Sequence, residues 1–143
     1  MTDDLRPRVP GGHDEQRATG MRVRREVLGD AHVDGAIAST SDFTADFQDY
    51  ITRNAWGDVW SRPGLERQTR SAIALAMLAT LGHEEELAMH VRAALRMGVT
   101  AAQIKEILLQ VAVYAGVPAA NTAFRVAQPI VDATSANTNV VES

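Results

Sequence analysis

The chain contains no cysteine, and this absence removes several kinds of chemistry together. Without a thiol there is no disulfide, no thiolate ligand for a metal and no cysteine-based redox catalysis. Lysine is nearly absent as well, because Lys105 is the only one in 143 residues. The sequence therefore offers no persuasive site for a cofactor that is bound through a lysine.

Positive charge and long apolar runs are also scarce. The chain has 14 Lys and Arg residues against 18 Asp and Glu residues, which gives a net charge of −4 and argues against a nucleic-acid partner. No apolar run is long enough to cross a bilayer, and no apolar segment follows the charges at the start as in a signal peptide. We therefore expect a cytoplasmic protein with no nucleic-acid partner and no membrane partner.

The apolar residues that are present recur at helical spacing. They make up 45% of the chain, which is enough to form the core of one domain. No segment shows a convincing strand pattern, so the sequence predicts an all-α fold. We expect a flexible N-terminal arm over residues 1–19, a single helical domain over residues 20–133 and a frayed tail over residues 134–143.

Turn and capping residues set the expected helix boundaries. Gly29 is placed to end a first helix that begins at Met21, and residues 30–40 are expected to form a connector with at most one helical turn. Residues 41–60 are expected to form one helix, capped by Ser41 or Thr40, and the aromatic and apolar residues on one of its faces are Phe43, Phe47, Tyr50 and Ile51.

Four more helices are expected in the second half of the chain. Residues 66–82 form a helix that is nearly all apolar after Ser71, which is typical of the middle of a bundle or of a subunit interface. Residues 82–98 form the next helix, and Thr100 with Gln103 forms a capping box that opens another. Pro118 suits the first turn of the last helix, which Pro129 is expected to end or kink near Gln128.

The stretch GHEEELAMHVRAALRMG, residues 82–98, places a titratable pair beside an apolar stripe. His90 lies at the edge of that stripe, and Glu86 lies one turn earlier. Glu86 could orient the imidazole and raise its pKa, which suits acid–base chemistry. From spacing alone, a buried histidine bonded to a neighbouring helix is the commoner explanation. A zinc site of His83, Glu86 and His90 is a third explanation, although metal sites with an open coordination position usually recruit ligands from several elements.

Six blocks of sequence occur in order: VRREVLGDAHVDG, FQDYITRNAWGDVW, RQTRSAIALAML, EEELAMHVRAAL, GVTAAQIKEILLQ and YAGVPAANTAF. Together they resemble the carboxymuconolactone decarboxylase family over residues 20–128. The resemblance implies an alkylhydroperoxidase D-like helical bundle and a homo-oligomer, a trimer or a hexamer, with sites near subunit contacts. The peroxidase relatives carry Cys-x-x-Cys-x-x-x-His. Aligned at His90, their two cysteines fall on His83 and Glu86, so peroxidase activity is excluded for want of a thiol.

The resemblance also implies an activity. This is the decarboxylation, without a cofactor, of a small dicarboxylate lactone, 4-carboxymuconolactone, to 3-oxoadipate enol-lactone in the breakdown of the aromatic compound protocatechuate. The bond electrons of the departing CO₂ can pass through the ring double bond to the lactone carbonyl, so the substrate supplies its own electron sink. The protein must still hold two carboxylates, stabilise negative charge on the lactone oxygen and deliver a proton.

The resemblance assigns candidate residues to these tasks. His90 becomes the preferred acid, with Glu86 as its orienter or as a second acid or base, and Arg70 becomes the preferred clamp for a carboxylate. The other candidates for substrate binding, each of which also has an ordinary packing or capping role, are Trp56, Tyr114 and Asn121. Two alternatives stay open, a decarboxylase or isomerase of a different small lactone or keto acid, and a non-catalytic helical oligomer.

Overall fold

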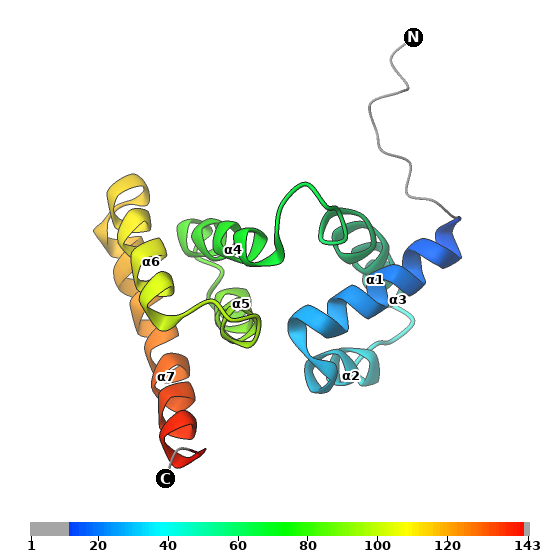
Figure 1. Cartoon of the computed structure of the whole chain (residues 1–143). Coiled ribbons are helices and arrows are strands. Elements are labelled where there is room, and N and C mark those ends of the chain that lie inside the picture. The colour runs from blue at the N-terminus through cyan, green and yellow to red at the C-terminus, as the bar shows by residue number, and fades with distance from the viewer. Residues whose placement is uncertain (1–11, 142–143) are drawn as a thin grey trace. The chain divides into compact units, whose positions relative to one another are not determined.

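A computed structural model describes residues 12–141, and all the regular structure in this range is helical. The helices in chain order are α1 (His13–Leu28), α2 (Asp30–Ala38), α3 (Ala45–Ile51), η1 (Thr52–Val59), α4 (Arg67–Leu81), α5 (Glu84–Arg96), α6 (Ala101–Ala115) and α7 (Val117–Val141) (Figure 1). The predicted all-α class is confirmed. Within residues 12–141, no helix combines the length and the hydropathy that spanning a bilayer requires.

The helices gather into two compact units, one within Met1–Gly64 and the other within Leu65–Ser143. The first contains α1, α2, α3 and η1, and the second contains α4 to α7. Each unit has its own internal packing and is described below separately. The single domain expected over residues 20–133 stays a prediction.

In the first unit, α1 and η1 approach each other so closely that only glycine fits at two contact points. A Cβ atom on Gly20 would lie 2.0 Å from the backbone oxygen of Thr52, and one on Gly57 would lie 2.3 Å from the backbone oxygen of Gln16. The side chain of Gln16 also donates a hydrogen bond of 3.0 Å to the carbonyl of Arg53. One glycine on each helix therefore sets the separation of α1 and η1.

The single helix expected over residues 41–60 is present only in part. The chain turns at residues 41–44, is α-helical in α3 and then widens into η1, a π-helix. Beyond its end, the N–H of Trp60 donates to the carbonyl of Ala55 at 2.9 Å, five residues back rather than four. Such segments are rare, and sequence periodicity does not distinguish them from α-helix.

Side chains in this segment bond to carbonyls that an α-helix would use for itself. The hydroxyl of Thr52 donates to the carbonyl of Gln48 at 2.8 Å, and the amide of Asn54 donates to the carbonyl of Tyr50 at 2.9 Å. The carbonyl of Gln48 still accepts the backbone N–H of Thr52, four residues later, so the Thr52 hydroxyl is an additional donor there. At the carbonyl of Tyr50 the Asn54 amide competes with the backbone N–H four residues later, and this competition favours the wider turns of η1.

The structure corrects the boundary of the N-terminal arm. α1 begins at His13, so residues 13–19 are helical and do not belong to a flexible arm. Asp14 and Glu15 favour this helix electrostatically at its N-terminus, and packing at Gln16 supports its first turns. Residues 1–11 of the expected arm lie outside the described residues.

The connector expected over residues 30–40 is also wrong, because most of it forms α2. Gly29, at a φ of 92°, ends α1 as predicted, but the chain enters a second helix at once. Val33 in α2 is fully buried, and Arg25 of α1 forms ion pairs with Asp30 at 3.1 Å and Asp34 at 2.8 Å. Contacts with α1 thus stabilise a short helix whose own sequence pattern is weak.

In the second unit, α4 to α7 share one apolar core. Gly82, at a φ of 75°, ends α4 as predicted. The capping box is confirmed, because the N–H of Gln103 donates to the Thr100 hydroxyl at 3.1 Å and its side chain accepts from the N–H of Thr100 at 2.9 Å. α7 contributes mainly small side chains and lies beside α6 (Figure 1). The buried core consists of Leu75, Ala79, Leu87, Val91, Ala94, Val99, Ile104, Leu108, Val111, Ala120, Ala123 and Ala127.

Pro129 was expected to end or kink the last helix near Gln128, and the helix does not end there. α7 passes through Pro129 and continues to Val141, so the expected tail is helical as far as the structure describes it. Ile130 packs on the core and Val131 lines a groove with α6, so contacts beyond the proline outweigh the lost backbone hydrogen bond. Hydroxyls that bond to carbonyls four residues earlier follow at Thr134, Ser135 and Thr138.

The contact of α1 with η1 yields a stability prediction. Gly20→Ala is expected to lower the free energy of unfolding by roughly 1–3 kcal/mol, because the new methyl group meets backbone that cannot move aside. Gly35→Ala in α2 is the matched control. No atom lies within 4 Å of its new Cβ, so this variant should be neutral or more stable by up to about 1 kcal/mol. Urea denaturation measures both, and equal effects would contradict the close contact.

Candidate active site

His90 lies in α5 and is buried, with 9% of its surface exposed. α5 begins after His83, and the three glutamates at 84–86 favour its N-terminus electrostatically. Leu87 and Val91 on the neighbouring positions belong to the apolar core. The helix therefore holds the imidazole beside that core, as the spacing in the sequence predicts.

Glu86, the expected partner of His90, is exposed in the first turn of α5. Among the described residues its carboxylate forms no hydrogen bond and no ion pair, so the contact that would orient the His90 ring is not made. The role of Glu86 stays a prediction. Within residues 12–141 no group of three or more histidine, aspartate and glutamate side chains is arranged to hold a metal ion.

Arg70 and Tyr114 lie near opposite ends of α4. Arg70 is half-buried in the first turns of α4, and the nearby Gln68 side chain donates to the carbonyl of Met97 at 2.8 Å, beside the end of α5. Tyr114 lines a groove together with Thr80, which is near the other end of α4. Along the axis of α4, Arg70 and Thr80 are about 15 Å apart. One chain therefore does not bring Arg70 and Tyr114 together around a small lactone.

The remaining candidates differ in exposure. Tyr114 is 85% exposed, and Asn121 in α7 is also exposed. Trp56 belongs to the first unit, is 5% exposed and stacks on Trp60, with ring centroids 5.1 Å apart and planes at 30°. This environment fits a packing role for Trp56. Packing was one of the two interpretations that the sequence left open, and a wall of the substrate pocket was the other.

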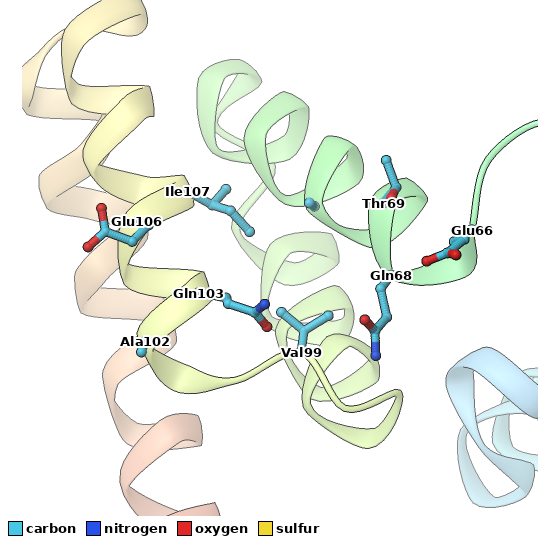
Figure 2. Close-up of a pocket in the computed structure, with 9 residues that line it drawn as sticks. Glu66, Gln68, Thr69, Val99, Ala102, Gln103, Glu106 and Ile107 are labelled. Atoms are coloured by element: carbon cyan, nitrogen blue, oxygen red, sulfur yellow. The ribbon is translucent and has the colours of Figure 1, made fainter.

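A groove of about 530 Å³ in the second unit lies between the starts of α4 and α6 (Figure 2). Glu66 and Glu106 lie at its two ends, with Gln68 and Gln103 between them. The carboxylates would repel a ligand that itself carries two negative charges. Despite its size, this groove is therefore poorly suited to a dicarboxylate.

A second groove, of about 380 Å³, follows the later turns of α4 and α6 and has no charged side chain in its wall. Neither this groove nor the first has His90 or Arg70 in its wall. The residues that line it are Ala72, Ile73, Ala76, Thr80, Ile107, Gln110, Val111 and Tyr114. Such an apolar groove fits a protein surface better than it fits a charged metabolite.

Arg24 is a candidate that the sequence reasoning missed. It is only 5% exposed, and its guanidinium donates to the hydroxyl of Thr52 at 3.3 Å and to the side-chain oxygen of Gln48 at 3.2 Å. Burial lowers the pKa of Arg24. A signal was present in the sequence, because Arg24 shares the inward side of α1 with Val23 and Val27 at helical spacing.

Other charged side chains of the first unit are paired with opposite charges. Asp49 accepts hydrogen bonds from Arg17 of α1 and from Arg53 of η1, the latter at 2.8 Å. The bond from Arg17, followed by that from Arg53, lowers the pKa of Asp49 to about 2. This network links α1 to η1 at the surface, where each cation has an anionic partner.

The chain is similar to known decarboxylases. The sequence pattern of the Carboxymuconolactone decarboxylase family matches residues 45–129. The 4-carboxymuconolactone decarboxylase of Acinetobacter baylyi is 50% identical over 119 residues, which cover 82% of this chain and 89% of that protein. The nitrosuccinic acid decarboxylase of Metarhizium robertsii is 40% identical over 113 residues, 79% of each chain. A 4-carboxymuconolactone decarboxylase of Pseudomonas putida is 59% identical over 39 residues, 27% of this chain and 81% of that one.

Proposed function

Because the chain belongs to the carboxymuconolactone decarboxylase family, we propose that it is a carboxy-lyase that converts 4-carboxymuconolactone to 3-oxoadipate enol-lactone in protocatechuate catabolism. The observation that carries this proposal is the similarity to the Acinetobacter baylyi enzyme along most of both chains. The second decarboxylase, from Metarhizium robertsii, acts on a different acid by its name, which keeps a different small acid as the alternative substrate.

The reaction needs no cofactor in this proposal, because the substrate accepts its own electrons. The bond between the ring carbon and the carboxylate breaks, and CO₂ leaves. The electron pair of the broken bond moves through the ring double bond to the lactone carbonyl oxygen, which gives a dienolate. One proton then adds to the ring carbon next to that carbonyl and gives the enol-lactone. The protein supplies binding, stabilisation of the oxygen and the proton.

His90 is the proposed proton donor. An imidazole changes its charge near neutral pH, which suits delivery of a proton to a carbanion-like carbon. Because His90 is buried beside the apolar core of the second unit, bulk water is also kept away from its ring. Arg70 is the proposed clamp for a carboxylate. Trp56 is the proposed pocket wall, in addition to its packing against Trp60. Tyr114 and Asn121 are exposed in one chain, so in this proposal they act across a contact between copies.

The proposal includes a homo-oligomer, a trimer or a hexamer. The second unit exposes large apolar side chains around the groove between α4 and α6, and an exposed patch of this kind is typical of an interface. The exposed fractions are 60% for Met77, 66% for Leu81, 79% for Val113 and 70% for Val117. A second copy of the chain would cover these side chains and would bring the neighbouring Tyr114 into contact with another subunit.

The first unit carries a further exposed apolar patch. The aromatic face that the sequence predicts for residues 41–60 is present, but Phe43 is 96% exposed, Phe47 is 61% exposed and Tyr50 is 59% exposed. Burial of aromatic side chains contributes strongly to association. This patch therefore also supports assembly.

The proposed oligomer can be tested by placing one charged side chain in the expected interface. Val113→Asp is expected to lower the molar mass in solution, because a carboxylate in a desolvated interface has no partner. The side chain is exposed within one chain, so the helical content should not change. Val140→Asp, in the last turn of α7, is the matched control and should keep the wild-type mass. Light scattering after size exclusion measures both, and a wild-type protein that is monomeric would contradict the proposal.

The proposed reaction is tested directly with purified protein. Protein treated with a chelator and mixed with freshly prepared 4-carboxymuconolactone is expected to release CO₂ and to form the enol-lactone in equal amounts, above the spontaneous rate. Related lactones and small keto acids, assayed in parallel, test the alternative substrates. If CO₂ release does not exceed the spontaneous rate, the proposal is wrong.

The role of His90 predicts a selective loss of turnover. His90→Gln is expected to lower kcat roughly 10²- to 10⁴-fold and to leave the oligomer intact, because an amide cannot deliver the proton. His32→Gln is the matched control, since His32 is exposed in α2 and has no assigned role. Steady-state kinetics with circular dichroism measures both, and wild-type kcat in His90→Gln would support a purely structural histidine.

A further inference from the structure

We propose that Arg24, with Gln48 and Thr52, forms a binding site for a small carboxylate, and that Arg24, in place of Arg70, holds the carboxylate of the lactone that remains in the product. This inference deepens the proposed function and rests on it for the identity of the ligand. The geometry of the site itself comes only from the first unit.

Arg24 is a buried cation that lacks an anion. No aspartate or glutamate pairs with it in the part of the chain that the structure describes, and its two acceptors there, Thr52 and Gln48, are both neutral. The arginines that do pair with carboxylates in this unit, such as Arg17 and Arg25, are more exposed. An unpaired charge out of water is costly, so an anion that reaches it would be bound strongly.

The hydrogen bonds of Arg24 leave one buried edge of the guanidinium without an acceptor among the described residues. Of its five N–H groups, one on Nη1 donates to Thr52 and one on Nη2 donates to Gln48. The Nε–H is buried and has no acceptor among the described residues. Nε and Nη2 lie on the same edge of the planar group, and this edge accepts the two oxygens of a carboxylate side by side.

Gln48 and Thr52 fix the orientation of the guanidinium through the hydrogen bonds that they accept. The Thr52 hydroxyl donates to the carbonyl of Gln48 at 2.8 Å, so its oxygen is fixed where it can accept from Nη1. Gln48 is half-buried, and its amide oxygen lies at Nη2 at 3.2 Å. A carboxylate bound at the Nε edge would replace this neutral oxygen with a charged one, while Thr52 keeps the guanidinium in place.

The chemistry of decarboxylation selects which carboxylate Arg24 holds. A tight, buried ion pair with the departing carboxylate would stabilise the ground state and slow the loss of CO₂. The same ion pair with the carboxylate that stays is equally strong before and after the bond breaks. Arg24 therefore contributes uniform binding, which lowers KM and leaves kcat nearly unchanged.

A nearly isosteric substitution tests the inference. Gln48→Glu places a carboxylate beside Arg24 within the chain and so neutralises the site. KM for 4-carboxymuconolactone is expected to rise about 10- to 100-fold with little change in kcat, because a charge-assisted contact is lost. Gln128→Glu, exposed in α7, adds the same charge elsewhere and should leave both constants unchanged. An unchanged KM in Gln48→Glu would overturn the inference.

Arg24→Met separates binding from folding. It removes the charge and keeps an apolar side chain of similar length, so KM should rise as in Gln48→Glu while the melting temperature stays the same or increases. If Arg24 were only structural, Arg24→Met would lower the melting temperature and leave KM unchanged, and that result would overturn the proposal.

An unreactive dicarboxylate tests the site without turnover. Adipate is expected to raise the melting temperature of the wild-type protein and to have no such effect on Gln48→Glu. If the wild-type protein does not decarboxylate the lactone, the proposed function fails, but the adipate measurement still tests Arg24. No shift with the wild-type protein, or an equal shift with Gln48→Glu, would show that Arg24 does not hold a small carboxylate.

Discussion

The contact between α1 and η1 is the constraint on which the first unit depends. Gly20 and Gly57 let the two backbones approach at a distance that excludes any Cβ atom. One turn after Gly20, the same approach places Arg24 against Thr52 and the end of α3. Close backbone packing thus has a chemical consequence, since it removes a guanidinium from water and fixes its orientation. The π-helical turns of η1 belong to this arrangement, because they supply one of the two glycines.

Each unit, taken by itself, holds one buried side chain that suits the proposed chemistry. The second unit provides a buried imidazole at His90, which suits transfer of a proton, within a core of aliphatic side chains. The first unit provides a buried cation at Arg24, which suits a carboxylate. The exposed apolar side chains of α4 and α6 favour association of copies. In the proposed mechanism the substrate carries the electron sink, so binding, orientation and one proton are the remaining requirements.

Local sequence signals predicted the features that local chemistry determines. Gly29 and Gly82 end helices because their φ angles favour glycine, and Thr100 with Gln103 forms a capping box whose atoms lie three residues apart. The features that depend on distant contacts were not predictable in this way. The helix beyond Pro129 is stabilised by packing on α6, and α2 is stabilised by its contacts with α1. Arg24 was missed for the same reason, because a charge on an inward position becomes significant only when its acceptors are known.

The most direct test of the mechanism follows the proton. Turnover of 4-carboxymuconolactone in D₂O, stopped early and examined by deuterium NMR in a chiral aligning medium, reports where and on which face the ring carbon is protonated. Delivery from one fixed side chain predicts a single deuterium at the carbon next to the lactone carbonyl, on one face only. Equal labelling of both faces, or a product without deuterium at this carbon, would contradict a dienolate that is protonated within the protein.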